Sequence, residues 1–174
     1  MAKWTPDVVH EYQIFVKAFV TSYAEKIDCA DLALASLVEF AYPRQLPIKL
    51  KYYKGGHWEK YDASDYPSMK DFESVVRQNM GALNVIDNTV PIKVGDAAPG
   101  DLIMTKWSAV EGHTRVIYSI APVDPASPAT DYDVVWYQGN VPIVIPERRE
   151  QLFSEIDHVF GASPRRWNYH QFEA

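Results

Sequence analysis

The chain has 174 residues, of which 47% are apolar and 13% aromatic, and it carries a formal net charge of −6. This length and composition predict one globular domain with a single core and exclude a disordered chain. The acidic balance, without a cluster of Lys and Arg among aromatic residues, argues against nucleic acid as a partner. No stretch of the sequence approaches the ~20 uncharged apolar residues of a membrane-spanning helix. The single cysteine cannot form an internal disulfide.

The N-terminal residues MAKWTPDVVHEYQ lack the basic start, the apolar run and the small-residue cleavage site of a secretory signal. We therefore expect a soluble protein that is made in the cytoplasm without a signal peptide. If it works in another compartment, a specialised secretion system would have to carry it there.

Two helices are predicted in the first part of the chain. Residues 5–7, Thr-Pro-Asp, are typical of a capped helix start. A long N-terminal helix is expected within residues 1–27, because apolar residues recur there every three or four positions. A second helix is expected to begin after Asp28, a favourable N-cap, and to end at Tyr42, because the residue before Pro43 is pushed out of the helical region.

Strands are predicted to dominate the rest of the chain. Residues 48–62 alternate around Gly55-Gly56 and predict a hairpin. A short amphipathic helix closed by a glycine is expected over residues 67–81. Further strands are predicted at residues 91–96, 102–104, 113–120, 131–138 and 141–146. Helices that precede an antiparallel sheet indicate an α+β fold.

Cys29 is expected in the first turn of the second helix. There the positive end of the helix dipole and unpaired N–H groups favour a thiolate, and the same N–H groups can stabilise an oxyanion. Asp28 and Asp31 oppose this effect, so a nucleophilic Cys29 needs a neighbouring base. The alternative is that Cys29 is a small apolar residue of the core, the usual role of a free cysteine.

His113 is the favoured base among five histidines, because it opens a predicted strand. A histidine at a strand edge that faces a helix N-terminus suits cysteine catalysis. His10, His57, His158 and His170 lie in segments predicted to be polar or exposed.

An amide is the predicted partner of the second ring nitrogen of His113. If residues 113–120 and 131–138 form a hairpin, Ile120 lies opposite Asp131 and His113 lies opposite Gln138. A slip of two residues brings Asn140 opposite His113 instead. The segment Gln138-Gly139-Asn140 can also be a polar turn without a catalytic role.

These motifs together resemble the NlpC-type cell-wall peptidases, which have a papain-like fold. That family has an Asp-Cys pair at the start of a core helix, a later Pro-Gly-Asp-Leu strand entry, a histidine that opens the next strand and a polar third residue. Here the same order is found in Asp28-Cys29, in residues 99–102, in Gly112-His113 and in Gln138. The sequence departs from the family on both sides of the Asp-Cys pair. The family usually has a tyrosine shortly before the pair and Ser-Gly after it, whereas here Ile27 precedes it and Ala30-Asp31 follows. The third residue is Gln138, where histidine is common in the family.

The resemblance implies a cysteine amidase or endopeptidase that acts on peptidoglycan stem peptides and needs no cofactor. Cys29 would be the nucleophile, His113 the base and Gln138 the orienting residue, within a core of residues 28–140 followed by a C-terminal extension, residues 141–174. In its expected lack of a signal peptide, the chain resembles the amidase effectors that bacteria deliver by type VI secretion. Such effectors contact the secretion apparatus and are paired with an immunity protein.

The residues that would bind the substrate, the substrate itself and the presence of catalysis each have alternatives. Arg115 and Asn140 are candidates for binding the substrate, and Arg148 and Arg149 could also meet its carboxylates; arginines of this kind are most often simply solvated. The same catalytic residues would suit a papain-like toxin or transferase that acts on a protein or a lipid. A binding domain without catalysis is the third hypothesis. No metal site is predicted, because the sequence shows no ligand spacing typical of one.

Overall fold

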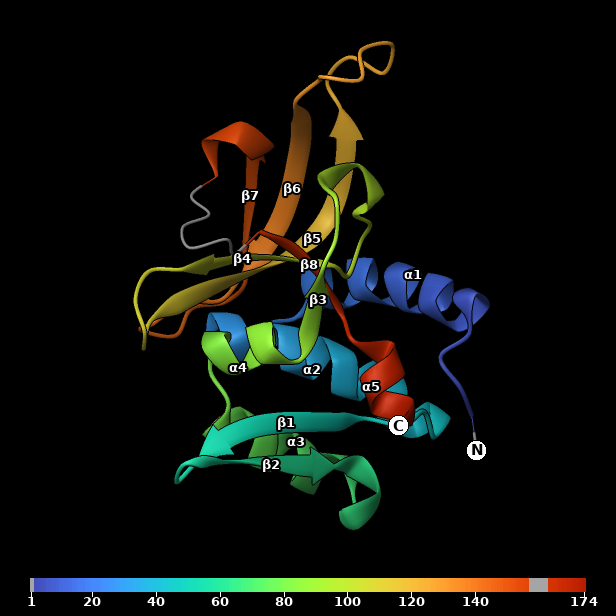
Figure 1. The fold of residues 1–174 in the computed structure, drawn as a ribbon, viewed down its shortest axis with the longest axis vertical. Coiled ribbons are helices and arrows are strands. Elements are labelled where there is room, and N and C mark those ends of the chain that lie inside the picture. The colour runs from blue at the N-terminus through green and yellow to red at the C-terminus, as the bar shows by residue number, and fades with distance from the viewer. Residues whose placement is uncertain (1, 157–162) are drawn as a thin grey trace.

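A computed structural model of the protein describes residues 2–156 and 163–174. It shows an α+β fold with five α-helices, a six-stranded antiparallel sheet and a separate two-stranded hairpin in these residues (Figure 1). The helices are α1 (Pro6–Ser22), α2 (Cys29–Ala41), α3 (Met69–Asn79), α4 (Ala82–Asp87) and α5 (Tyr169–Glu173). In the described part of the chain, none of the helices has the length and apolar character needed to cross a membrane.

The strands of the large sheet follow the order β3-β8-β4-β5-β6-β7, and every neighbouring pair is antiparallel. Their bounds are β3 (Thr89–Pro91), β4 (Leu102–Lys106), β5 (Gly112–Pro122), β6 (Tyr132–Gln138), β7 (Glu147–Leu152) and β8 (Pro164–Trp167). The predicted hairpin is present as β1 (Lys49–Lys54) and β2 (His57–Asp62), and it lies at the end of the molecule opposite the β5–β6 loop (Figure 1).

The central element of the core is α2. Eleven of its residues are buried, so its surface is apolar on nearly all sides, which is the pattern of a helix enclosed by other elements. It packs against α1, α3 and β5. Asp28 caps it as predicted, because the Asp28 side chain accepts a hydrogen bond from the Asp31 N–H at 2.7 Å, and the helix ends at Ala41 just before Tyr42.

Two features fix the Pro-Gly-Asp turn before β4: the backbone conformation of its glycine and an ion pair of its aspartate. Gly100 has φ +86°, a conformation that favours glycine, and an added Cβ would lie 3.1 Å from the ring of Tyr12. Asp101 is buried and binds Arg166 of β8 through an ion pair of 2.7 Å. This motif therefore joins the start of β4 to the C-terminal strand of the sheet.

Four sequence expectations about elements are wrong. The first helix ends at Ser22, and Ile27 instead forms a β-bridge with Val144. Residues 82–87, in the part of the chain expected to be β-rich, form α4, because Gly81 begins a second helix. Residues 91–96 contribute only the end of β3 and a 3-10 turn. The strand expected at 141–146 is displaced to β7.

The expected register between β5 and β6 is also wrong. Ile120 pairs with Val134 and not with Asp131, and the register shifts between Ile117 and Ser119. The reason is that β5 continues to Pro122, so the connecting loop is shorter than predicted. Residues 141–174, predicted to be a C-terminal extension, supply β7, β8 and α5.

Candidate active site

Cys29 is the first residue of α2 and is only 7% exposed. The backbone N–H groups of Cys29 itself and of Ala30, at the start of the helix, favour the thiolate form of the Cys29 sulfur. A third backbone N–H comes from Thr114, the residue that follows His113 in β5. The helix start and the start of β5 therefore lie close together at Cys29.

Burial raises the pKa of the Cys29 thiol, and the charge of Asp28 raises it further. The three backbone N–H groups act in the opposite direction, but they do not overcome the loss of solvation. The N–H groups at the start of α2 thus lower the pKa and Asp28 raises it, as expected, but burial outweighs the N–H groups in the free protein. The resting form of Cys29 is the neutral thiol.

His113 is the second residue of β5 and is also 7% exposed. Its Nε2–H donates to Oε1 of Gln138 at 2.7 Å. The indole of Trp107 stacks on its ring with 5.8 Å between centroids and 7° between planes. Burial lowers the pKa of His113, the Gln138 hydrogen bond acts against this, and the positive charge of Arg115 lowers it further.

The two shifts have a joint chemical consequence. With the pKa of Cys29 raised and that of His113 lowered, the pair rests as thiol and neutral imidazole. A neutral imidazole can take a proton from the thiol during attack, which is general base catalysis. The arrangement suits a nucleophile that is activated only when a substrate carbonyl is in place.

The end of β6 is fixed to the start of α2 by backbone contacts. The Asn140 N–H donates to the carbonyl oxygen of Ile27 at 3.2 Å. Ile27 and Val144 exchange two further hydrogen bonds of 2.8 and 3.3 Å. A Cβ on Gly139 would lie 2.3 Å from the carbonyl oxygen of Asp28, so only glycine allows this approach. The positions of Gln138 and Cys29 are therefore coupled through the backbone.

The side chain of Asn140, the alternative to Gln138, bonds to its own backbone neighbour: its Oδ1 accepts from the Val141 N–H at 2.8 Å. Continuing the Val116–Tyr137 pairing places residue 140 opposite His113. Gln138 is thus a diagonal neighbour on the same face, and its longer side chain spans the offset.

The predicted arginines differ in their surroundings. Arg115 is only 9% exposed and donates to Oγ1 of Thr105 at 2.8 Å inside the protein. Arg148 and Arg149 are exposed on β7, where they pair with Glu150 at 3.5 Å and with Glu147. His10, His57 and His170 are exposed, and His158 lies outside the described residues.

Three residues near the site were not identified from the sequence. Trp107 covers the His113 ring, Trp136 donates to Oε1 of Gln138 at 3.2 Å, and Gly139 allows the contact with α2. Trp136 could have been found from the sequence, because side chains two residues apart in a strand lie on the same face, and Trp136 precedes Gln138 by two residues. No sequence pattern predicted the stacking of Trp107.

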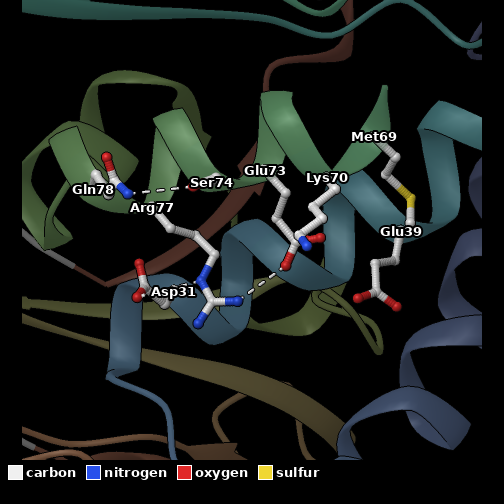
Figure 2. Close-up of a pocket in the computed structure, with 8 residues that line it drawn as sticks. All are labelled: Asp31, Glu39, Met69, Lys70, Glu73, Ser74, Arg77 and Gln78. Atoms are coloured by element: carbon white, nitrogen blue, oxygen red, sulfur yellow. Dashed lines mark hydrogen bonds and ion pairs between the residues drawn. The ribbon is translucent and has the colours of Figure 1, made fainter. Parts of the chain in front are cut away.

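A groove of about 520 Å³ lies between α2 and α3, and its lining does not include the Cys29 or His113 side chain (Figure 2). Arg77 of α3 bridges two acidic residues there, with 3.4 Å to Asp31 and 3.1 Å to Glu73. Burial, with the nearby charge of Asp28, raises the pKa of Asp31 to about 6, although Arg77 opposes this. The groove is a partly desolvated ionic cluster beside the first turn of α2.

Among residues 2–156 and 163–174, no group of three His, Cys, Asp or Glu side chains is placed to hold a metal ion. Comparison of the chain with protein-family models, with curated proteins and with solved structures finds no match. The function is therefore inferred from the geometry of Cys29, His113 and Gln138 and from the resemblance of their sequence motifs.

Proposed function

We propose that this protein is a papain-like cysteine hydrolase that cleaves an amide bond in peptidoglycan stem peptides. The observation that carries the reaction type is the meeting of Cys29 with the His113 segment, together with the 2.7 Å hydrogen bond between His113 and Gln138. A buried thiol at a helix N-terminus, a neutral imidazole and an acceptor for the second ring nitrogen are the groups that such a reaction needs.

The reaction follows from the protonation states. The unprotonated Nδ1 of His113 takes the thiol proton as Sγ of Cys29 attacks the substrate carbonyl carbon. Backbone N–H groups at the start of α2 stabilise the negative oxygen that forms. The imidazolium then gives its proton to the leaving amine, and a thioester remains on Cys29. Water, deprotonated by His113, hydrolyses this thioester and restores the thiol.

The substrate class is supported by the resemblance to NlpC-type peptidases rather than by a pocket. We extend the proposal to a role as an antibacterial effector, delivered to the periplasm of a target cell by a type VI apparatus and neutralised by an immunity protein. Arg115 is not included as a substrate ligand, because its guanidinium is buried and hydrogen-bonded to Thr105.

The first test is digestion of purified peptidoglycan followed by mass spectrometry, with Cys29→Ala as the matched control. We expect new stem-peptide fragments from the wild type only, and their masses will identify the bond. Intact peptidoglycan under both proteins would contradict the proposed substrate. Acylation of Cys29 by an activated ester that is lost in His113→Ala would in that case leave a hydrolase or transferase with another substrate.

The second test addresses the effector role. The chain is directed to the periplasm of a Gram-negative host with an added signal peptide, and retained in the cytoplasm in a parallel strain. We expect lysis only from the periplasmic form with an intact Cys29. Equal toxicity from both locations would argue for a cytoplasmic target.

A further inference from the structure

The amide of Gln138 has two hydrogen-bonding neighbours at a single oxygen. Its Oε1 lies 2.7 Å from Nε2 of His113 and 3.2 Å from Nε1 of Trp136. Trp136 precedes Gln138 by two residues in β6, so both side chains lie on the face of the sheet that His113 shares. One acceptor atom thus joins the indole to the imidazole.

The indole determines which end of the amide faces His113. A tryptophan N–H can only donate, whereas a glutamine amide offers an oxygen that accepts and an NH2 group that donates. If the amide of Gln138 were turned over, its NH2 group would face the indole N–H of Trp136, and two donors would oppose each other. The oxygen is therefore held toward both rings.

The orientation of the amide determines the tautomer of His113. An oxygen opposite Nε2 requires the proton on Nε2, which leaves the lone pair on Nδ1. An NH2 group at the same place would favour the proton on Nδ1, and that nitrogen then has no lone pair to accept the proton of Cys29. A turned amide would hold the base in its inactive form.

We infer that Trp136 is a positioning residue for the proposed hydrolysis, which sets the active tautomer of His113 by fixing the Gln138 amide. The inference rests on the proposed function for its effect on rate, but not for its effect on the tautomer. Trp136 is suited to this role because it is buried and held in place: it packs in a small core cluster with Ile103, Ile117, Val134 and Ile156.

The first experiment compares Trp136→Phe in two backgrounds, with Gln138 and with Gln138→Glu. Phenylalanine keeps an aromatic ring but has no N–H donor. With Gln138 present, we expect kcat/KM to fall about three- to tenfold, since one hydrogen bond that selects the amide orientation is lost. In Gln138→Glu both carboxylate oxygens accept, so orientation no longer matters and Trp136→Phe should have no further effect.

This design separates positioning from packing. If Trp136 serves only to fill the core, Trp136→Phe should cost the same factor in both backgrounds, and that result would overturn the inference. If the phenylalanine variant does not fold, 3-benzothienylalanine is placed at position 136, because this tryptophan isostere has sulfur in place of the N–H and preserves the shape.

The second experiment reads the tautomer directly, from the 15N chemical shifts of the His113 ring at a pH where it is neutral. We expect a proton on Nε2 in the wild type and a measurable Nδ1–H fraction in Trp136→Phe. Trp167→Phe is the matched control, because Trp167 is also buried and its Nε1–H donates to Oη of Tyr12 at 3.3 Å. An unchanged Nε2–H tautomer in Trp136→Phe would refute the role of Trp136.

The two readouts also distinguish this inference from the proposed function. A tautomer that shifts in Trp136→Phe, in a protein that leaves peptidoglycan intact, would support the positioning role and contradict the substrate. A wild type that cleaves peptidoglycan, with rate and tautomer unaffected by Trp136→Phe, would support the function and contradict the positioning role.

Discussion

Gly139 and Asp28 lie so close together that a Cβ on Gly139 would be 2.3 Å from the carbonyl oxygen of Asp28. This approach brings the end of β6, which carries Gln138, against the residue that caps the helix of Cys29. The hydrogen bond between the Asn140 N–H and the Ile27 carbonyl, 3.2 Å, holds the same two segments together. Two of the three proposed catalytic residues are thus positioned by one backbone contact.

Gly139→Ser should therefore damage both stability and activity. The added Cβ must push β6 away from Asp28, and overpacking of this kind costs about 1–3 kcal/mol of unfolding free energy. We expect a lower melting temperature together with a loss of peptidoglycan cleavage. Gly81→Ser is the control, because an added Cβ there meets no atom within 4 Å and serine is a favourable helix N-cap. Equal melting temperatures for the two variants would show that β6 tolerates the displacement.

The pH dependence of catalysis should reflect the lowered pKa of His113. Burial disfavours the imidazolium, so the ring remains a neutral base to a lower pH than an ordinary histidine of pKa 6.5. Because activity needs the neutral ring, we expect kcat/KM to rise with pH and to reach half its plateau below pH 6.5. A midpoint above that value would mean that His113 is more solvated than the structure shows.

Gln138→Ala should move that midpoint further down. The hydrogen bond to Gln138 raises the pKa of His113, so its removal favours the neutral ring still more. At the same time the ring loses the acceptor that orients it, and the plateau of kcat/KM should fall by about 10-fold or more. A lower plateau with a midpoint moved to higher pH would argue against Gln138 as the partner of His113.

Local sequence signals predicted the elements that carry the site. The cap at Asp28, the start of α2 at Cys29 and the start of a strand at His113 depend on neighbouring residues, and the structure shows each of them. The contact of His113 with Gln138 also occurs, although the register behind it was wrong. It survives because a long amide side chain reaches a diagonal neighbour as well as a directly opposite one.

Features that depend on distant segments were not predictable in this way. Ile27 continues the helical spacing of the N-terminal segment, but it pairs with Val144 because residues 139–144 return to α2. For Cys29, the N–H groups at the start of α2 favour a lower pKa as expected, but burial of the thiol outweighs them. In both cases tertiary contacts outweigh a local preference.

The raised pKa of Asp31 should make the unfolding free energy depend on pH, independently of catalysis. Its pKa is raised to about 6 in the folded protein, so the folded state binds this proton more tightly than the unfolded chain does. The unfolding free energy should therefore fall as pH rises from about 4 to about 6. Asp31→Asn removes the charge, and should raise the unfolding free energy at pH 7 by about 1–2 kcal/mol.

The control for Asp31→Asn is Asp71→Asn. Asp71 is the third residue of α3, as Asp31 is of α2, but it is exposed. Chemical denaturation at pH 4.5 and pH 7 should show the gain at the higher pH for Asp31→Asn only. A loss of stability at pH 7 would mean that the ion pair with Arg77, 3.4 Å long, outweighs the cost of burying the carboxylate.

Trp107 provides a direct test of why the pKa of His113 is low. The indole stacks on the imidazole but is itself 48% exposed, so it separates the ring from solvent. Trp107→Ala should admit water and raise the pKa of His113 toward 6.5, because desolvation is the main cause of its lowering. NMR titration of the His113 ring measures this shift, and the acid midpoint of kcat/KM should move up with it. Trp58→Ala, which removes an indole that is 53% exposed on β2, should leave both values unchanged. A pKa that stays low in Trp107→Ala would assign the desolvation to the core beneath the ring instead.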